Sequence, residues 1–246
     1  MDQVTLSSIL SYTGVVFEAG LLVVLLRRRL AVDLWEISLY LLTALSVGAA
    51  RYYALARYGF ASQQYGTCYW ATDLLLVLAA FVLVVSFFRR ACSENAEMWQ
   101  FVKMLLGAVL IAIAVISYFS LANHRGEIFS SFTIEFSQNL YFASLVLTTL
   151  LYLMTLRMDL ADERLGLLVC GLGIEFAGPA AGLALVHLTS VPEVSRLVGI
   201  YLIPLCDAGM ILTWFYAISR IPGLAKVPQG RVKPAPAFAR GNISHF

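Results

Sequence analysis

Seven apolar stretches of about twenty residues follow one another along the chain, with short polar connectors between them. The hydrocarbon core of a bilayer is roughly 30 Å thick, and an α-helix crosses it in about 20 residues. The pattern therefore predicts an all-α membrane protein built as a single bundle of seven transmembrane helices. The predicted helices cover residues 6–26, 34–57, 68–88, 101–122, 136–157, 165–188 and 197–219.

Composition supports a membrane location and a single domain. Hydrophobic residues make up 60% of the 246 residues and charged residues only 13%, which is about half the charged share of a soluble globular protein. The connectors leave no room for a second domain. After residue 219 the sequence becomes rich in proline, glycine and basic residues. We therefore expect residues 220–246 to form a disordered basic tail on the cytoplasmic side.

The placement of basic residues predicts the orientation of the bundle. With the N-terminus outside, the first predicted helix brings the three arginines at residues 27–29 to the cytoplasm. Of the 17 Lys and Arg residues, only Arg51, Arg57, Arg125 and Arg196 then lie on the outer side. Cytoplasmic connectors of membrane proteins carry an excess of Lys and Arg. We therefore expect the N-terminus outside and the C-terminus in the cytoplasm.

Two charged residues lie in the outer third of neighbouring predicted helices, Arg51 in the second and Asp73 in the third. A charge at the centre of a membrane helix costs about 2.5–3.5 kcal/mol and marks a candidate functional position. These two side chains neutralise one another, or Arg51 extends to the outer headgroups. The functional alternative is an outward-facing site for an anion or small ligand, with Tyr69 and Trp70 as its aromatic walls. A third possibility is an isolated charge that faces lipid.

Three carboxylic acids lie near the midplane of the predicted bundle: Glu18 in the first helix, Glu175 in the sixth and Asp207 in the seventh. No basic residue is expected at the same depth, so three ionised carboxylates would be costly there. Three interpretations stay open. The acids are protonated and bond to neighbouring helices, they form a relay for protons or a cation, or they line a pocket for a ligand.

Two prolines accompany these acids. Pro179 lies four residues after Glu175, and Pro204 lies one turn before the acid of the seventh helix. A proline inside a helix frees the carbonyl four residues back, so we expect both helices to kink near their acid. Broken helices at this depth commonly carry binding sites. Alternatively, Gly178 and Gly182 form a small-residue spacing that favours close packing of helices.

The sequence offers little for cofactor or catalytic chemistry. The four cysteines and three histidines show no metal-ligand spacing, and no nucleophile and base lie at helical spacing. We therefore expect neither a metal site nor an enzyme. Residues 207–211, DAGMI, resemble the last helix of microbial rhodopsins, but Ile211 stands where that family has its lysine. Without that amine a retinal Schiff base cannot form, and we expect no cofactor.

The third predicted helix opens with a pattern of aromatic and acidic residues. Residues 65–73 read YGTCYWATD, which puts Tyr65, Tyr69, Trp70 and Asp73 in a Tyr-x-x-x-Tyr-Trp-x-x-acid spacing. This segment resembles the start of the third helix in uncharacterised acidobacterial-type seven-helix membrane proteins, although aspartate stands where glutamate is more usual. The resemblance implies a multi-pass protein of a bacterial inner membrane, and it implies no function.

Taken together, these features favour a sensor or receptor-like protein that binds a small molecule within the bundle. Because no signalling domain follows the seventh predicted helix, the output would pass to a separate cytoplasmic or membrane protein partner on the basic face. Two alternatives stay open: a small transporter coupled to protons or a cation, and an accessory subunit of a larger membrane complex. In each case the lipid bilayer surrounds the protein, and no nucleic-acid partner is expected.

Overall fold

The computed structural model describes residues 3–60, 62–93, 95–121, 128–157, 163–189 and 198–220. Within these residues the secondary structure is helical and the connections are turns. The helices are α1 (Gln3–Arg27), α2 (Trp35–Tyr58), α3 (Gln63–Ala91), α4 (Ala96–Leu121), α5 (Ile128–Arg157), α6 (Glu163–Thr189) and α8 (Ile203–Arg220), with a π-helical segment, η1 (Val198–Leu202), directly before α8.

The helices follow the predicted spans and mostly extend beyond them. Hydropathy marks only the apolar part of a helix, whereas the helical backbone continues into polar residues at its ends. Helix α3 begins at Gln63 rather than at 68, because the Ser62 hydroxyl accepts a hydrogen bond from the Tyr65 amide at 3.1 Å and caps the first turn. Residues 221–246 of the predicted tail lie outside the described residues.

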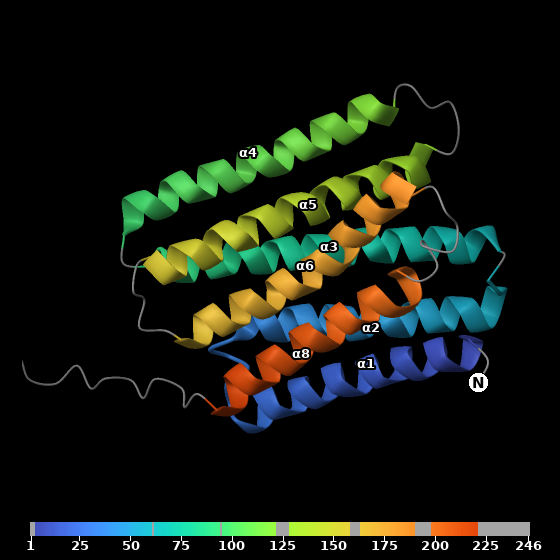
Figure 1. Ribbon diagram of the computed structural model, residues 1–246, viewed down its shortest axis with the longest axis horizontal. Helices are drawn as coiled ribbons and strands as arrows, with labels where there is room; N and C mark the ends of the chain where they lie inside the picture. Colours follow the sequence, from blue (N-terminus) through green and yellow to red (C-terminus); the bar gives the residue numbers. More distant parts are fainter. Residues whose placement is uncertain are drawn as a thin grey trace, which may run out of the picture.

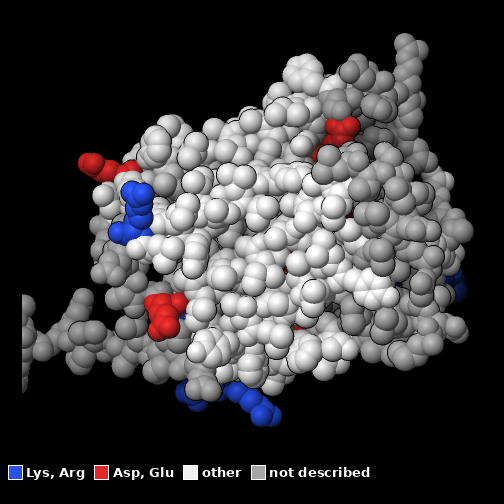
Figure 2. All heavy atoms as spheres, viewed as in Figure 1, with Lys and Arg blue, Asp and Glu red and all other residues white. Residues whose placement is uncertain are grey.

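Among the residues that the structure describes, five helices, α2 to α6, are long and apolar enough to cross a membrane, and α8 is a shorter apolar helix. Large hydrophobic side chains remain exposed on their outer faces, such as Ile111 on α4, Leu153 on α5 and Leu212 on α8. On the face shown in Figure 2, most charged side chains lie near the edges, and only small parts of acidic side chains are visible in the broad surface between them. An apolar surface of this extent indicates an integral membrane protein.

Six helices form a ring, and α4 lies outside it (Figure 1). Around the ring, α1 contacts α2, α2 contacts α3, α3 contacts α5, α5 contacts α6, α6 contacts α8, and α8 contacts α1. Helix α4 packs against α5 and more lightly against α3. Helices α1, α3 and α8 end at the same end of the bundle. We call this the arginine-rich end, because it carries the arginines at residues 27–29 together with Arg89 and Arg90.

Glycines on α6 allow its close packing against α8. A Cβ atom at Gly171 would lie 2.7 Å from the Trp214 ring, and one at Gly178 would lie 3.0 Å from the Cβ atom of Cys206. Trp214 is fully buried, and its indole Nε1 donates a hydrogen bond to the Leu168 carbonyl at 2.9 Å, which holds the ring in place. The predicted role of small residues in close helix packing is therefore confirmed.

The two prolines occupy different positions in their helices. Pro179 lies inside α6, which continues on both sides of it. Pro204 is the second residue of α8 and directly follows the π-helical segment, so the backbone hydrogen-bonding pattern changes just before it. Because η1 and α8 form one continuous helical run, Pro204 lies inside that run, where it has no N–H to donate. The kinks predicted at these prolines stay predictions.

We expect Gly171→Ala to lower the free energy of unfolding by about 1–3 kcal/mol, because the added methyl group overpacks the buried Trp214 ring. Gly166→Ala on the same helix is the control, since a Cβ atom there meets nothing within 4 Å. Alanine favours a helix by roughly 0.5–1 kcal/mol over glycine, so the control is expected to be neutral or stabilising. Thermal unfolding in one detergent, followed by tryptophan fluorescence, measures both. Equal midpoints would contradict the close packing.

Candidate functional site

Arg51 on α2 and Asp73 on α3 form an ion pair between their helices. The Arg51 Nη2 atom lies 3.3 Å from the Asp73 Oδ1 atom. The same guanidinium donates to the Thr72 hydroxyl at 2.9 Å and to the Tyr69 carbonyl at 3.4 Å. Its central carbon also lies 4.3 Å from the centre of the Tyr69 ring, within the range of a cation–π interaction. The neutralisation of these two charges, one of the alternatives predicted from the sequence, is confirmed.

Of the two aromatic residues beside this pair, Tyr69 contacts Arg51 and Trp70 packs against Tyr69. The rings of Tyr69 and Trp70 meet edge-on, with their centroids 5.3 Å apart. The guanidinium of Arg51 is already bonded to three oxygen atoms and covers the Tyr69 ring. The geometry therefore fits a tie between α2 and α3 better than it fits an anion site.

Glu175 on α6 and Asp207 on α8 bring two carboxyl groups together in the glycine-lined interface. The two groups lie within hydrogen-bonding reach of one another. A close contact between the two helices lies next to these acids. The Cγ2 atom of Ile174, which precedes Glu175, lies 3.2 Å from the position of a Cβ atom at Gly209. The Glu175 Oε2 atom is inaccessible to solvent and has no hydrogen-bond partner among the residues that the structure describes.

Glu18 and Tyr40 complete the surroundings of this carboxyl pair. Glu18 on α1 lies within electrostatic range of both Glu175 and Asp207. Tyr40 on α2 is buried, lies within electrostatic range of all three acids, and meets the Trp214 ring edge-on at a centroid distance of 5.9 Å. The structure thus brings the three midplane acids to one region. We call Glu18, Glu175 and Asp207 the carboxyl cluster.

Tyr141 on α5 lies in the bundle near both the ion pair and the carboxyl cluster. It lies within electrostatic range of Arg51 and Asp73 on one side and of Glu175 on the other. Its ring meets the buried Phe176 ring edge-on, with the centroids 6.3 Å apart. Tyr141 is therefore close enough to feel the charge of both groups.

Three residues of this region were missed by reasoning from the sequence: Tyr40, Tyr141 and Thr72. None of them carries a charge that would have marked it inside an apolar segment. Each becomes part of the site only because a neighbouring helix turns a charged group toward it. These hydroxyl groups can be found only by asking which helix faces pack together, and the sequence alone does not give that arrangement.

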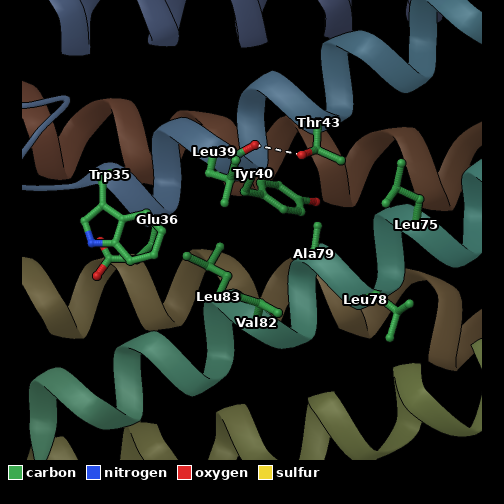
Figure 3. Close-up of a pocket in the computed structure, with 10 residues that line it drawn as sticks. All are labelled: Trp35, Glu36, Leu39, Tyr40, Thr43, Leu75, Leu78, Ala79, Val82 and Leu83. Carbon is green, nitrogen blue, oxygen red and sulfur yellow. Dashed lines mark hydrogen bonds between the residues drawn. The ribbon is translucent and has the colours of Figure 1, made fainter.

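A groove between α2 and α3 leads along the side of the bundle to Tyr40 (Figure 3). Its volume is about 280 Å³, and its lining is mainly apolar, with Trp35 and Glu36 toward the arginine-rich end. The Thr43 hydroxyl in this groove donates to the Leu39 carbonyl at 2.9 Å. Tyr40 therefore separates the lipid-facing groove from the carboxyl cluster.

Arginine side chains tie the helix ends at the arginine-rich end. Arg28, which follows α1, donates from Nη1 to the Ile218 carbonyl at 2.9 Å and to the Ser219 carbonyl at 3.1 Å, at the end of α8. Arg90 on α3 lies 2.7 Å from the Glu36 carboxylate on α2. Cations at a helix C-terminus are stabilising, because the last carbonyls carry partial negative charge.

Comparison of the chain with protein-family models, with curated proteins and with solved structures finds no match. The function is therefore inferred from the geometry and chemistry of the site itself.

We expect Asp73→Ala to lower the free energy of unfolding by about 1–3 kcal/mol, because the half-buried Arg51 guanidinium loses its carboxylate partner. Arg57→Ala is the control, since Arg57 is an exposed charge on α2, the helix that carries Arg51. Changes at exposed positions usually stay within about 0.5 kcal/mol. Thermal midpoints of the two variants in the same detergent give the comparison. If Asp73→Ala unfolds no earlier than the control, the ion pair does not tie α2 to α3.

Proposed function

We propose that this protein is a seven-helix membrane sensor whose carboxyl cluster binds a proton or a small cation. In this proposal all seven α-helices cross the membrane, with the N-terminus outside and the arginine-rich end in the cytoplasm. The contact between Glu175 and Asp207 carries the proposal. Two carboxyl groups in contact cannot both be ionised at low cost, so a proton or a cation between them stabilises the pair.

The chemistry of the cluster supports a very small ligand. Its carboxyl oxygens suit a proton best, because no three acids, histidines or cysteines among the described residues lie close enough together to surround a metal ion. The glycine-lined packing of α6 on α8 brings Gly178 against Cys206 one turn away from Glu175, which leaves little space for an organic molecule. The small-molecule ligand expected from the sequence is thereby narrowed to an ion.

Helix α8 supports the sensor interpretation because it connects the carboxyl cluster with the arginine-rich end. Asp207 lies in its first half, and Arg28 binds the carbonyls of its last residues. A change in the charge of the pair alters the electrostatic force between α6 and α8. A resulting shift of α8 would change the hydrogen bonds between Arg28 and the last carbonyls of α8. A separate protein partner at the arginine-rich end would read that shift.

A transporter coupled to protons or a cation is the second candidate. Tyr141 favours it, because this residue lies within electrostatic range of both the carboxyl cluster and the Arg51–Asp73 ion pair. Transport requires that the ion can reach the carboxyl cluster from both sides of the membrane. Access from one side only would be enough for a sensor that binds the ion. An accessory-subunit role would instead appear as a membrane protein that copurifies at fixed stoichiometry.

Glu175→Gln and Asp207→Asn test ion binding at the pair. Infrared spectroscopy of the protein in nanodiscs separates protonated carboxyl groups from carboxylates. We expect the wild type to show a protonated-carboxyl band, or a carboxylate band that shifts on addition of Na⁺ or Ca²⁺, and we expect both variants to lose it. Glu97→Gln is the control, because Glu97 is exposed in the first turn of α4. A wild-type spectrum with neither band would contradict the proposal.

Reconstitution into liposomes separates the sensor from the transporter. For a sensor we expect ion binding without net flux of protons or Na⁺ under an imposed gradient. A flux that Glu175→Gln abolishes and Glu97→Gln retains would replace the sensor with the transporter. Fluorescent pH and Na⁺ indicators inside the liposomes provide the measurement.

A further inference from the structure

The groove between α2 and α3 is largely apolar and has a buried floor. Tyr40 and Leu83 line it and are buried, whereas Leu39 and Val82 line it and remain exposed. Ala79 points from α3 toward α2 and contributes only a methyl group to the lining (Figure 3). On the outer face of a protein that spans a membrane, such a groove is open to the acyl chains of lipids.

The groove has nearly the length of one bilayer leaflet. It follows α3 from Leu75 to Leu83, eight residues that rise roughly 12 Å along the helix. One half of the hydrocarbon core is roughly 15 Å thick. Leu75 lies near the middle of α3, so the groove runs from the middle of the bundle toward the arginine-rich end. It therefore matches one acyl chain of a lipid in the leaflet at that end.

Arg89 continues the row of α3 side chains that lines the groove. It lies seven residues after Val82 and fourteen after Leu75, and seven residues make nearly two turns of an α-helix. From Leu75 to Arg89 the helix rises roughly 21 Å, which is half of the roughly 40–45 Å that a bilayer measures with its headgroups. Arg89 is exposed, so its guanidinium lies at the depth of the lipid headgroups beyond the end of the groove.

The two arginines at this end of α3 differ in their partners. The Arg90 Nη2 atom lies 2.7 Å from the Glu36 carboxylate and also donates to the Asp33 carbonyl. Arg89 makes no hydrogen bond or ion pair with any residue that the structure describes. A guanidinium binds a phosphate group through two parallel N–H···O bonds. Arg89 is therefore free to bind a phosphate, whereas Arg90 already ties α3 to α2.

The arginine-rich end of the groove also favours a negatively charged headgroup. Residues 27–36 and 89–90 hold five arginines and two acids, so the surroundings are positively charged. Trp35 lines the groove at this end and is exposed (Figure 3), and tryptophan is enriched at the depth of lipid headgroups. Apolar, aromatic and basic groups thus follow one another in the order of an acyl chain, the interface and a phosphate.

We propose that the groove between α2 and α3 binds one anionic phospholipid, with an acyl chain along Leu39 and Val82 and with its phosphate at Arg89. Basic pockets between membrane helices are known to bind anionic headgroups. Because Tyr40 separates the groove from the carboxyl cluster, the lipid lies on the outer side of this ring. The inference goes beyond the proposed function and does not depend on what the carboxyl cluster binds.

Native mass spectrometry of the full-length protein tests the choice of headgroup. The protein in detergent is titrated with phosphatidylglycerol or with phosphatidylcholine of the same acyl chains. We expect one phosphatidylglycerol to bind roughly fivefold more tightly, the effect of one arginine near a lipid headgroup, and Arg89→Gln to remove this preference.

Arg157→Gln is the matched control for Arg89→Gln. Arg157 is exposed and ends α5 at the same end of the bundle (Figure 1), but α5 does not line the groove. We expect this variant to keep the preference of the wild type. If both variants lose it equally, the basic end attracts anionic lipid as a whole and the site at Arg89 is overturned.

Brominated acyl chains locate the bound lipid, because bromine quenches the fluorescence of tryptophans that it contacts. With one equivalent of brominated phosphatidylglycerol, we expect Trp35→Phe to lose at least half of the quenching seen in the wild type. Trp99→Phe removes a half-buried tryptophan near the start of α4 and should be quenched like the wild type. If Trp35→Phe is quenched as strongly as the wild type, the acyl chain does not occupy this groove.

Ala79→Phe tests the groove from the inside, because the added ring fills the space between α2 and α3. We expect it to weaken the binding of both lipids at least fivefold. Phosphatidylglycerol that binds this variant as tightly as the wild type would overturn the proposal. A dimer that forms in place of the lipid complex would overturn it as well, since a second copy of the chain would then cover the groove.

Discussion

The contact of the Trp214 ring with the glycine side of α6 determines the distance between α6 and α8, and the rest of the site depends on that distance. The indole nitrogen is held by the Leu168 carbonyl at 2.9 Å, and a Cβ atom at Gly171 would come within 2.7 Å of the ring. At this separation the carboxyl groups of Glu175 and Asp207 meet. A larger residue at Gly171 would move α6 and α8 apart, and the carboxyl groups of Glu175 and Asp207 would then no longer lie close together.

The Arg51–Asp73 ion pair and the carboxyl cluster differ in how many of their polar atoms have hydrogen-bond partners. This difference suggests a structural role for the ion pair and a binding role for the carboxyl cluster. Arg51 meets a carboxylate, a hydroxyl, a carbonyl and an aromatic face, so its charge is balanced within the protein. The Glu175 Oε2 atom is buried with no partner among the described residues. In a medium of low dielectric constant an unsatisfied polar atom is costly, and binding an ion or water recovers that cost. The carboxyl cluster is therefore where a ligand gains most.

The arrangement also explains how a small ligand could have a distant effect. The helices that hold the acids continue to the arginine-rich end, where Arg28 binds the end of α8. A packed interface with buried side chains such as Trp214 and Phe176 does not deform gradually. In the proposed sensor, a change in charge at the pair would pass along α8 as a rigid displacement, while α4, outside the ring, need not take part.

By itself the sequence determined the helical class, the approximate limits of the helices and the unusual charges within them, because bilayer thickness and hydropathy act locally along the chain. It also offered the neutralisation of Arg51 by Asp73 as one alternative, since the two residues lie on consecutive helices. Only the tertiary structure decided that Tyr40 and Tyr141 join the site. Those relations arise where helices far apart in sequence pack together. Their cause is the fit of side chains between faces, which the apolar pattern of a single helix does not encode.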